Sequence, residues 1–385
     1  MAENITGDAH ADEHRLENVE EQGEPGGPLW ALANAGPSLR EISALTAEAG
    51  LSELAEDGRP RAVVVAGVGT AARTGDILQT VAGPRCPVPI FAHRSEGVPG
   101  WVGAGDVVLA VSGSGRSPEA LAAAEAAARR GARLVAIGAP DSQLQGVAER
   151  ARAPFIPVPR RAPALMSLWA LAVPVLMAGR ALGLVPVTEA DIAETARRLD
   201  EDAERCRPTA DSFVNPAKEM AMNLAGTVPV VWGSSPLAGV AALRFGDMLA
   251  TNARYPAVAG ELTEVGRGQV GLLDGPYGSL VDRDIFADEA AETRLRIILM
   301  RDDGLEGDDT TPEPDKRRAE AIIELAEQRN LHLDIVNAEG GCALERLASL
   351  IAVTDFASVY LALAHGFDPR KVPAVAEMKD LVAGS

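Results

Sequence analysis

Three serines, two glycines and an arginine between an apolar run and a helix start have a spacing suited to binding phosphate. Residues 107–111 are apolar, residues 112–117 read S-G-S-G-R-S, and a helical pattern begins at Pro118. Glycine lets the backbone approach an anion, serine supplies hydroxyl donors, and a helix amino end adds free N–H groups and a positive dipole. We therefore predict that Ser112, Ser114 and Ser117 bind a phosphorylated small molecule.

The same residues also suit an ordinary strand-to-helix turn, in which Ser117 only caps the helix. Two better-known motifs are absent from this segment. The P-loop needs a Lys after its last glycine, and the nucleophile elbow needs one Ser between two glycines.

A second glycine-containing turn offers a competing interpretation. Residues 67–72 read G-V-G-T-A-A after a predicted strand, which fits the dinucleotide-binding pattern G-x-G-x-x-A of an NAD(P)-dependent oxidoreductase. The acidic residue that should follow the second strand is missing, since His93, Arg94 and Ser95 stand there. This weighs against the oxidoreductase.

Composition restricts the classes of partner. The net charge of −19 would repel a nucleic-acid backbone, so we expect no nucleic-acid partner. Cys86, Cys206 and Cys342 have no C-x-x-C spacing, and His10 and His14 form a pair only within an acidic segment. We expect buried free thiols, no bound metal and no cofactor.

The amino-terminal residues lack the apolar core of a signal peptide, and no run of about 18 residues is both wholly apolar and free of charge. We therefore expect a cytoplasmic location and no membrane partner. Residues 1–28 are rich in acids and end in E-P-G-G-P, which predicts a flexible or loosely docked acidic arm.

Apolar periodicity predicts helices alternating with short strands, the pattern of an α/β fold with parallel sheets. Residues 29–56 are expected to be helical. The expected strands are 61–66, 88–92, 106–111, 133–137, 154–158, 228–232, 295–300 and 331–336. The expected helices are 71–82, 118–130, 141–151, 162–182, 188–206, 216–225, 236–254, 315–329, 343–366 and 372–382. The acidic run 302–315 reads as a solvated loop.

The two halves of the chain contain a similar strand-turn-helix sequence. A strand at 63–66 leads to a helix containing G-D-I-L at 75–78, and a strand at 230–232 leads to a helix containing G-D-M-L at 246–249. A duplicated α/β unit explains this, although chance similarity between two strand-turn-helix elements is the alternative. We expect one domain over residues 29–186 and a second over 187–385.

Taken together, these motifs resemble those of the bifunctional phosphoglucose/phosphomannose isomerases, which have two sugar isomerase (SIS) domains. Residues 67–76 look like the family's G-M-G-G-S-x-x-x-G-D, and residues 111–119 look like V-S-Y-S-G-N-T-E-E. Residues 159–160 resemble its P-R, and residues 215–218 resemble the opening of its second domain. Residues 358–363 and 366–369 match S-x-Y-L-A-L and G-x-D-P. The resemblance runs from Gly67 to Lys379 and implies two SIS-type, doubly wound α/β domains, each a mostly parallel sheet flanked by helices.

The resemblance also implies roles for individual residues. Those implied in binding the sugar phosphate are Gly69, Thr70, Ser112, Ser114, Ser117 and Arg160. The first turn is altered, because Ala71 replaces a ligand-facing serine and leaves Thr70 as the nearby hydroxyl. Lys379 falls where the family's carboxyl-terminal lysine reaches the site, although a lysine at a helix end is otherwise only a solvated charge.

The positions implied in catalysis have changed. Aldose–ketose isomerisation needs a carboxylate that moves a proton between C1 and C2 and a group that opens the sugar ring. Thr251 stands at the position of the family's Glu, and Arg267, 16 residues later, stands at that of its His. Neither a threonine nor an arginine can act as a base near neutral pH. Glu264 keeps the Glu that precedes the family's His, and Glu261 is near.

Two hypotheses follow from this resemblance. The chain binds a phosphorylated hexose and has weak or no isomerase activity, or it is a working isomerase in which Glu264 or Glu261 is the base and Arg267 stabilises the enediolate. Because family members build their sites where subunits meet, and because residues 162–182 and 343–366 are strongly apolar, we also expect a homodimer that buries these helices.

Overall fold

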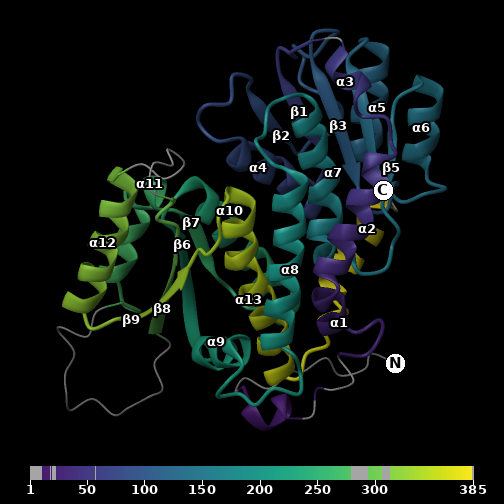
Figure 1. Cartoon of the computed structure of the whole chain (residues 1–385). Coiled ribbons are helices and arrows are strands. Elements are labelled where there is room, and N and C mark those ends of the chain that lie inside the picture. The colour runs from purple at the N-terminus through teal and green to yellow at the C-terminus, as the bar shows by residue number, and fades with distance from the viewer. Residues whose placement is uncertain are drawn as a thin grey trace, which may run out of the picture. The chain divides into compact units, whose positions relative to one another are not determined.

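The computed structural model describes residues 11–17, 19, 23–56, 58–278, 294–305 and 313–383, apart from the side chains of Ala164, Lys379 and Ala383. These residues form two compact units, each built on one parallel β-sheet (Figure 1). The first-sheet unit comprises Ala31–Glu201 and Gly340–Ala348. The second-sheet unit comprises Met1–Trp30, Asp202–Glu339 and Ser349–Ser385. Each unit is thus discontinuous in sequence, unlike the consecutive ranges expected from the sequence.

The first sheet is made of short apolar strands. They are β1 (Val63–Ala66), β2 (Ile90–His93), β3 (Val107–Ser112), β4 (Arg133–Gly138) and β5 (Phe155–Pro157). The strands are parallel and lie in the order β2-β1-β3-β4-β5. Every residue of β1 and β3 is buried, as expected for strands covered by helices on both faces.

Alternate residues of these strands face two layers of helices. Val64, Val108 and their neighbours of the same parity pack with alanines of α5 (Pro118–Arg129) and with α6 (Gln143–Ala151). On the other face lie α4 (Thr70–Ala82) and α7 (Leu168–Ala181). A Cβ on Gly75 of α4 would lie 3.0 Å from Cβ of Val65, so glycine permits the close packing of α4 on β1.

The remaining helices of this part of the chain are α1 (Pro28–Ala33), α2 (Ala35–Ala47), α3 (Glu53–Glu56), a 3-10 turn at Ala164–Met166 and α8 (Glu189–Arg205). Helix α2 packs against α7. The predicted helix over 162–182 therefore begins later than expected, at Leu168.

The second sheet contains β6 (Thr227–Gly233), β7 (Val258–Glu261), β8 (Arg294–Arg301) and β9 (His332–Asn337), parallel and in the order β7-β6-β8-β9. One face packs on α11 (Leu262–Val265) and α12 (Glu313–Gln328) through Trp232, Ile297 and Leu299. Helix α10 (Pro236–Met248) contacts β6, β7 and β8 (Figure 1). The other elements are η1 (Glu13–Leu16), α9 (Pro216–Leu224), η5 (Gln269–Asp274), α13 (Ala343–Ala364) and α14 (Pro373–Ala383).

The two sheets share one topology. In each, the first strand lies between the second and third strands, and the fourth follows the third; the first sheet adds β5. This repeat of strand order supports a duplicated α/β unit over chance similarity, and the doubly wound, parallel α/β class expected from the sequence is confirmed.

Two local expectations were incomplete. The strand β7 was missed, because its residues V-A-G-E are short and half-buried and lack a β-branched run. The helix expected over 236–254 ends at Met248 and continues as one π-helical turn, Leu249–Ala253, closed by Arg254 at φ 55°.

The apolar helices expected at a dimer interface are instead covered within the chain. Eleven residues of α7 are buried, from Leu168 to Gly179. Helix α13 is long and apolar enough to cross a membrane by length and composition, with mean hydropathy 1.8, but 94% of that window is buried in the protein. Its Asp355 forms a buried ion pair with Arg244 of α10, with Nη2 to Oδ2 at 2.7 Å. Both helices therefore have less exposed apolar surface than the sequence suggests.

Two acidic segments are less solvated than expected. In the run 302–315, Asp302 is fully buried and Asp315 is 6% exposed; residues 306–312 lie outside the described residues. In the amino-terminal arm, Leu16 is fully buried and its carbonyl oxygen accepts a hydrogen bond of 3.0 Å from Nζ of Lys218. This part of the arm is therefore docked, whereas His10 lies outside the described residues.

Candidate functional site

The two glycine-containing turns meet at the carboxyl edge of the first sheet. Strands β1 and β3 are neighbours, with Ala66 opposite Ala110. The chain leaves β1 toward β2 on one side, while β3 continues the sheet on the other, so the strand order changes direction here. Ligands of open α/β sheets bind at such a point.

The first turn lies directly against the end of β3. A Cβ on Gly67 would come within 2.8 Å of the carbonyl oxygen of Val111, so only glycine allows the two strand ends to approach this closely. Gly69 has φ 57°, a conformation that favours glycine, and Thr70 then begins α4. No side chain caps α4 in the described structure, which leaves its first N–H groups free to bind an anion.

The second turn gathers its serine hydroxyls beside the amino end of α5. Ser112 is 3% exposed, and its Oγ lies 3.4 Å from Oγ of Ser114. The same Ser112 Oγ accepts a 3.3 Å hydrogen bond from the backbone N–H of Ser117. The N–H of Arg116 donates to Ser114 Oγ at 3.2 Å. The two serines and these N–H groups thus form one hydrogen-bonding cluster.

Ser117 is not an ordinary cap. It occupies the N-cap position of α5, but its side chain accepts no hydrogen bond from the helix. Its Oγ donates instead to Oε2 of Glu119 at 2.8 Å. The capping interpretation of Ser117 is therefore not what the structure shows, and a carboxylate stands beside the expected phosphate position.

A third helix amino end approaches the same turn. A Cβ on Gly115, whose φ is 65°, would lie 2.1 Å from Oγ of Ser142, the residue that caps α6. A Cβ on Gly138 would lie 2.4 Å from the carbonyl oxygen of Ser112. The turn is thus held between β4 and the start of α6, and the positive ends of α5 and α6 both approach it.

Arg160 lies at the same edge of the sheet, just beyond β5. Its side chain is exposed and has no hydrogen bond or ion pair with any described residue. Arg94, which would be needed for a dinucleotide 2′-phosphate, is engaged by Asp76 with Nη2 to Oδ2 at 2.6 Å. Arg160 remains available to a ligand, whereas Arg94 is paired.

The candidate catalytic residues lie in the second-sheet unit. Thr251 is half-buried in the π-helical turn, an irregularity frequently found at functional sites. The neighbouring Asn252 is 1% exposed and donates to Ser358 Oγ at 2.8 Å, while its Oδ1 has no partner among the described residues. Arg254 holds the end of the turn through a 2.7 Å hydrogen bond to the carbonyl of Lys371.

The two carboxylates proposed as a substitute base differ in environment. Glu264 on α11 is exposed, as is Arg267 just after it, and in the described structure neither side chain has a hydrogen-bond or ion-pair partner. Glu261 ends β7, is half-buried, and packs over Gly239 of α10, where a Cβ would lie 3.0 Å from its own. Burial raises the pKa of Glu261, and the charges of Asp315 and Glu264 raise it further. Of the two, Glu261 is better suited to accept and return a proton.

Lys379 lies on α14, but its side chain is outside the described structure.

Of the predicted site residues, the structure brings together Gly69, Thr70, Ser112, Ser114 and Ser117, and it places Arg160 at the same sheet edge. Thr251, Glu264 and Arg267 belong to the other unit.

Sequence reasoning missed the role of Asp302 in the second sheet. Strands β6 and β8 correspond in order to β1 and β3, so the equivalent crevice lies where these two end. The Asp302 carboxylate lies there, accepting from Ser235 Oγ at 2.9 Å and from the N–H of Gly304 at 3.1 Å. Its own N–H donates to Ser234 Oγ at 2.8 Å. An internal carboxylate thus accepts a hydrogen bond from the Ser235 hydroxyl group that a ligand at this crevice would meet.

One described cluster has the composition of a metal site. Asp191, Cys342 and Glu345 present ligand atoms within 4.8 Å of one another. Asp191 already accepts from Thr188, and Glu345 accepts from Gly341 and pairs with Arg198. Burial raises the pKa of the Cys342 thiol to about 11, whereas a metal requires the thiolate. The cluster therefore fits a hydrogen-bonded network better than a metal centre.

Comparison with known proteins agrees with this architecture. Residues 213–382 match the family described as the bacterial phospho-glucose isomerase C-terminal SIS domain. A bifunctional phosphoglucose/phosphomannose isomerase from Caldicellulosiruptor bescii is 26% identical over 327 residues, which cover 83% of this chain and 89% of the relative.

Two solved structures show the same fold. A hypothetical protein from Thermus thermophilus superposes with a TM-score of 0.70 and 17% identity, covering 97% of this chain and 93% of that one. The tagatose-6-phosphate ketose/aldose isomerase of Escherichia coli has a TM-score of 0.60 and 16% identity, covering 89% and 93% of the two chains.

The repeated parallel sheets fit a fold with two SIS-type sheets, and residues 213–382 match a SIS-domain family. The resemblance to the bifunctional phosphoglucose/phosphomannose isomerases is confirmed, because a SIS-domain family matches residues 213–382 and a protein of that name is similar over most of the chain.

Proposed function

We propose that this chain binds a phosphorylated hexose at the turns after β1 and β3 and has weak or no isomerase activity. The observation that carries the proposal is the cluster of Ser112 and Ser114 hydroxyls with the uncapped amino end of α5 at the change in strand order. Hydroxyl and backbone donors at helix ends are the groups that bind phosphate esters. A relative named as a phosphoglucose/phosphomannose isomerase supports a phosphorylated hexose as the ligand. Thr251 and Arg267, which replace the acid–base residues of that family, support weak or no isomerase activity.

Calorimetry with fructose 6-phosphate tests the binding site. Replacing Ser112 and Ser114 together by alanine removes two donors, each worth roughly 1–3 kcal/mol when its phosphate partner is left unpaired. We expect affinity to fall by about 10-fold or more. Ser52→Ala with Ser212→Ala, outside both turns, is the matched control. Unchanged affinity in the Ser112/Ser114 variant would show that the site is elsewhere.

A working isomerase is the second candidate, and the environment of Glu261 favours it. Its half-buried carboxyl group with a raised pKa is suited to proton transfer, whereas the exposed Glu264 is not. Assays of the interconversion of glucose 6-phosphate, mannose 6-phosphate and fructose 6-phosphate decide between the candidates. Ordinary turnover that is lost in Glu261→Gln would establish the isomerase.

We retain three further expectations as part of the proposal: a cytoplasmic location, no nucleic-acid or membrane partner, and a homodimer. Since α7 and α13 are buried within the chain, a dimer would have to use other surfaces. Sedimentation velocity at micromolar concentration tests this, and a purely monomeric species would contradict it.

A further inference from the structure

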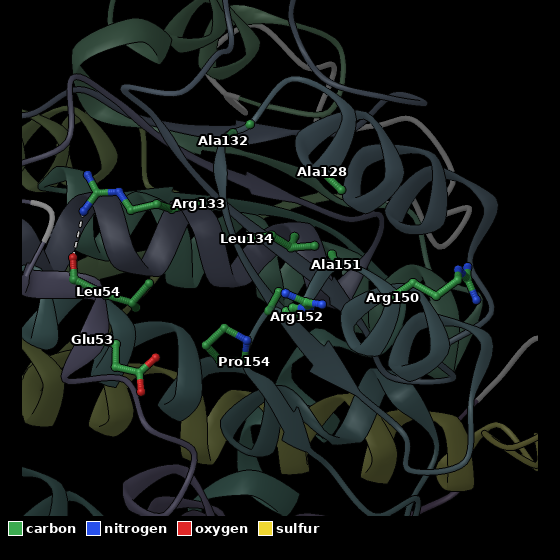
Figure 2. Close-up of a pocket in the computed structure, with 12 residues that line it drawn as sticks. Glu53, Leu54, Ala128, Ala132, Arg133, Leu134, Arg150, Ala151, Arg152 and Pro154 are labelled. Carbon is green, nitrogen blue, oxygen red and sulfur yellow. Dashed lines mark hydrogen bonds between the residues drawn. The ribbon is translucent and has the colours of Figure 1, made fainter.

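We propose that the first-sheet unit has a second anion-binding site, at the edge of the sheet opposite the phosphate-binding turns. A cavity of about 540 Å³ opens there, lined by α3, the end of α5, the start of β4 and the segment between α6 and β5 (Figure 2). This volume is in the range of small-molecule pockets. The site would take a compact metabolite with at least two negative charges.

The cavity lies far from the phosphate-binding turns. Arg133 is the first residue of β4, and Pro154 immediately precedes β5, so the cavity adjoins the amino ends of two parallel strands. Ser112 and Gly138 mark the carboxyl ends of β3 and β4. A strand of this length separates the two edges by about 20 Å. One small ligand cannot occupy both places.

The lining combines an apolar floor with positive charge. Leu54, Ala132 and Leu134 are 5–8% exposed and form part of the floor. The charged lining residues are Arg133, Arg150, Arg152 and Glu53. The local balance is thus three positive charges to one negative, in a chain whose net charge is −19. An excess of cations in an acidic protein concentrates anions locally.

These arginines have no carboxylate partners in the described structure. Arg133 donates from Nη1 to the carbonyl oxygens of Leu54 at 2.7 Å and Gly58 at 3.0 Å, so its charge is positioned but not neutralised. Arg152 lies beside Ala151 and Pro154 in Figure 2, and its side chain has no hydrogen bond or ion pair within the described residues. Arg150 likewise has none there; it is exposed, and in Figure 2 its guanidinium group points away from the other lining residues.

The conformation of Arg152 gives a second reason to assign a role to this cavity. It closes α6 with φ 55°, a position where glycine or asparagine is ordinarily preferred. The carboxyl ends of α5 and α6 carry partial negative charge, which arginines could simply balance. That partial charge is about half a unit per helix, whereas three full positive charges line the cavity.

Calorimetry with inorganic pyrophosphate at low salt tests the site. The experiment uses the Ser112→Ala/Ser114→Ala protein, in which binding at the turns is weakened. We expect pyrophosphate still to bind, and the added pair Arg150→Gln/Arg152→Gln to lower its affinity by about 10-fold. The added pair Arg205→Gln/Arg207→Gln removes the same charge from exposed positions outside the cavity and should change affinity less than about 2-fold.

Absence of pyrophosphate binding, equal losses in the two arginine pairs, or no loss in the cavity pair would each overturn the proposal. Glu53→Gln gives an independent measurement that does not depend on the stability of the arginine variants. Removing the only acid in the lining should raise affinity severalfold, and unchanged affinity would also count against the site. Parallel titrations with citrate distinguish a phosphate ligand from a polycarboxylate.

Discussion

Among the three serines of the turn after β3, Ser117 is the one whose hydroxyl donates to a carboxylate, that of Glu119. A phosphate at this turn would meet the Glu119 carboxylate as a like charge. We expect Glu119→Gln to strengthen fructose 6-phosphate binding by about 3- to 10-fold, since it removes the repulsion and retains an acceptor for Ser117. Glu125→Gln on the exposed side of α5 is the control. Weaker binding in Glu119→Gln would show that the carboxylate contacts the sugar instead.

The altered pair Thr251 and Arg267 leads to a prediction about turnover. Each missing acid–base group is worth about 10²- to 10⁴-fold in rate. If the chain binds hexose phosphates without isomerising them, Thr251→Glu with Arg267→His should raise turnover, and Glu261→Gln in the natural sequence should change little.

Coupled assays with fructose 6-phosphate measure this turnover, and each single variant serves as a control for the pair. High natural turnover that falls on Glu261→Gln would show that the base has moved rather than vanished. The half-buried position and raised pKa of Glu261 make it the residue to test first.

At the scale of the elements, Arg61 and Asp106 tie together the starts of β1 and β3, whose other ends carry the candidate site. Asp106 is fully buried and accepts from Arg61 Nη2 at 2.6 Å and from the Gly103 N–H at 2.8 Å. The hydrogen bond from Arg61 lowers the pKa of Asp106. We expect Asp106→Asn to reduce the free energy of unfolding by about 1–3 kcal/mol at pH 7, because the buried side chain loses its charged hydrogen bond with Arg61. The effect stays this small because Arg61 is partly exposed to solvent.

The pH dependence of this effect follows from the direction of the shift. Since the folded pKa of Asp106 lies below its ordinary value of 3.8, the stabilisation is complete above that value and is lost as the pH falls through the folded pKa. Urea titrations of both proteins should therefore give curves that converge in acid. A difference that stays constant down to pH 2 would exclude the ionised pair as its cause.

The strands and helices with strong sequence patterns were predicted correctly, whereas the elements whose conformation depends on tertiary contacts were missed. The apolar runs of β1 and β3 and the alanine spacing of α5 are visible in the sequence. The strand β7 is defined by pairing with β6, and its V-A-G-E residues carry little pattern of their own. The π-helical turn at Thr251 likewise has no sequence signature.

The candidate site was predictable to a similar extent. Glycine and serine spacing located the two turns of the candidate site, because those residue types are required by local geometry; phosphate binding there stays a prediction. The engagement of Ser117 by Glu119, the burial of Asp302 and the arginine-lined cavity depend on side-chain placement in the folded chain. An acidic run such as 302–315 predicts a solvated loop, and only the folded structure shows that Asp302 is buried.

For the whole molecule, the repeated topology raises the question of how many ligands one chain binds. The crevice at β1 and β3 has free donors, while the equivalent one at β6 and β8 holds Asp302. We therefore expect one fructose 6-phosphate to bind per chain at the strand crevices, and the Ser112→Ala/Ser114→Ala variant to retain no second crevice site of unchanged affinity. Two equivalents per chain that persist in Arg150→Gln/Arg152→Gln, and so do not come from the arginine-lined cavity, would contradict this interpretation of the second sheet.

Asp302 also behaves as a tethered ligand. It stands one residue beyond β8, and its carboxylate is presented to Ser235 without any loss of translational freedom. Such attachment corresponds to an effective concentration on the order of millimolar or more, which a dilute free metabolite would have to exceed. The crevice of the second sheet is thus filled by a side chain of the same protein. Asp302 alone would have to be replaced or displaced before a ligand could reach Ser235.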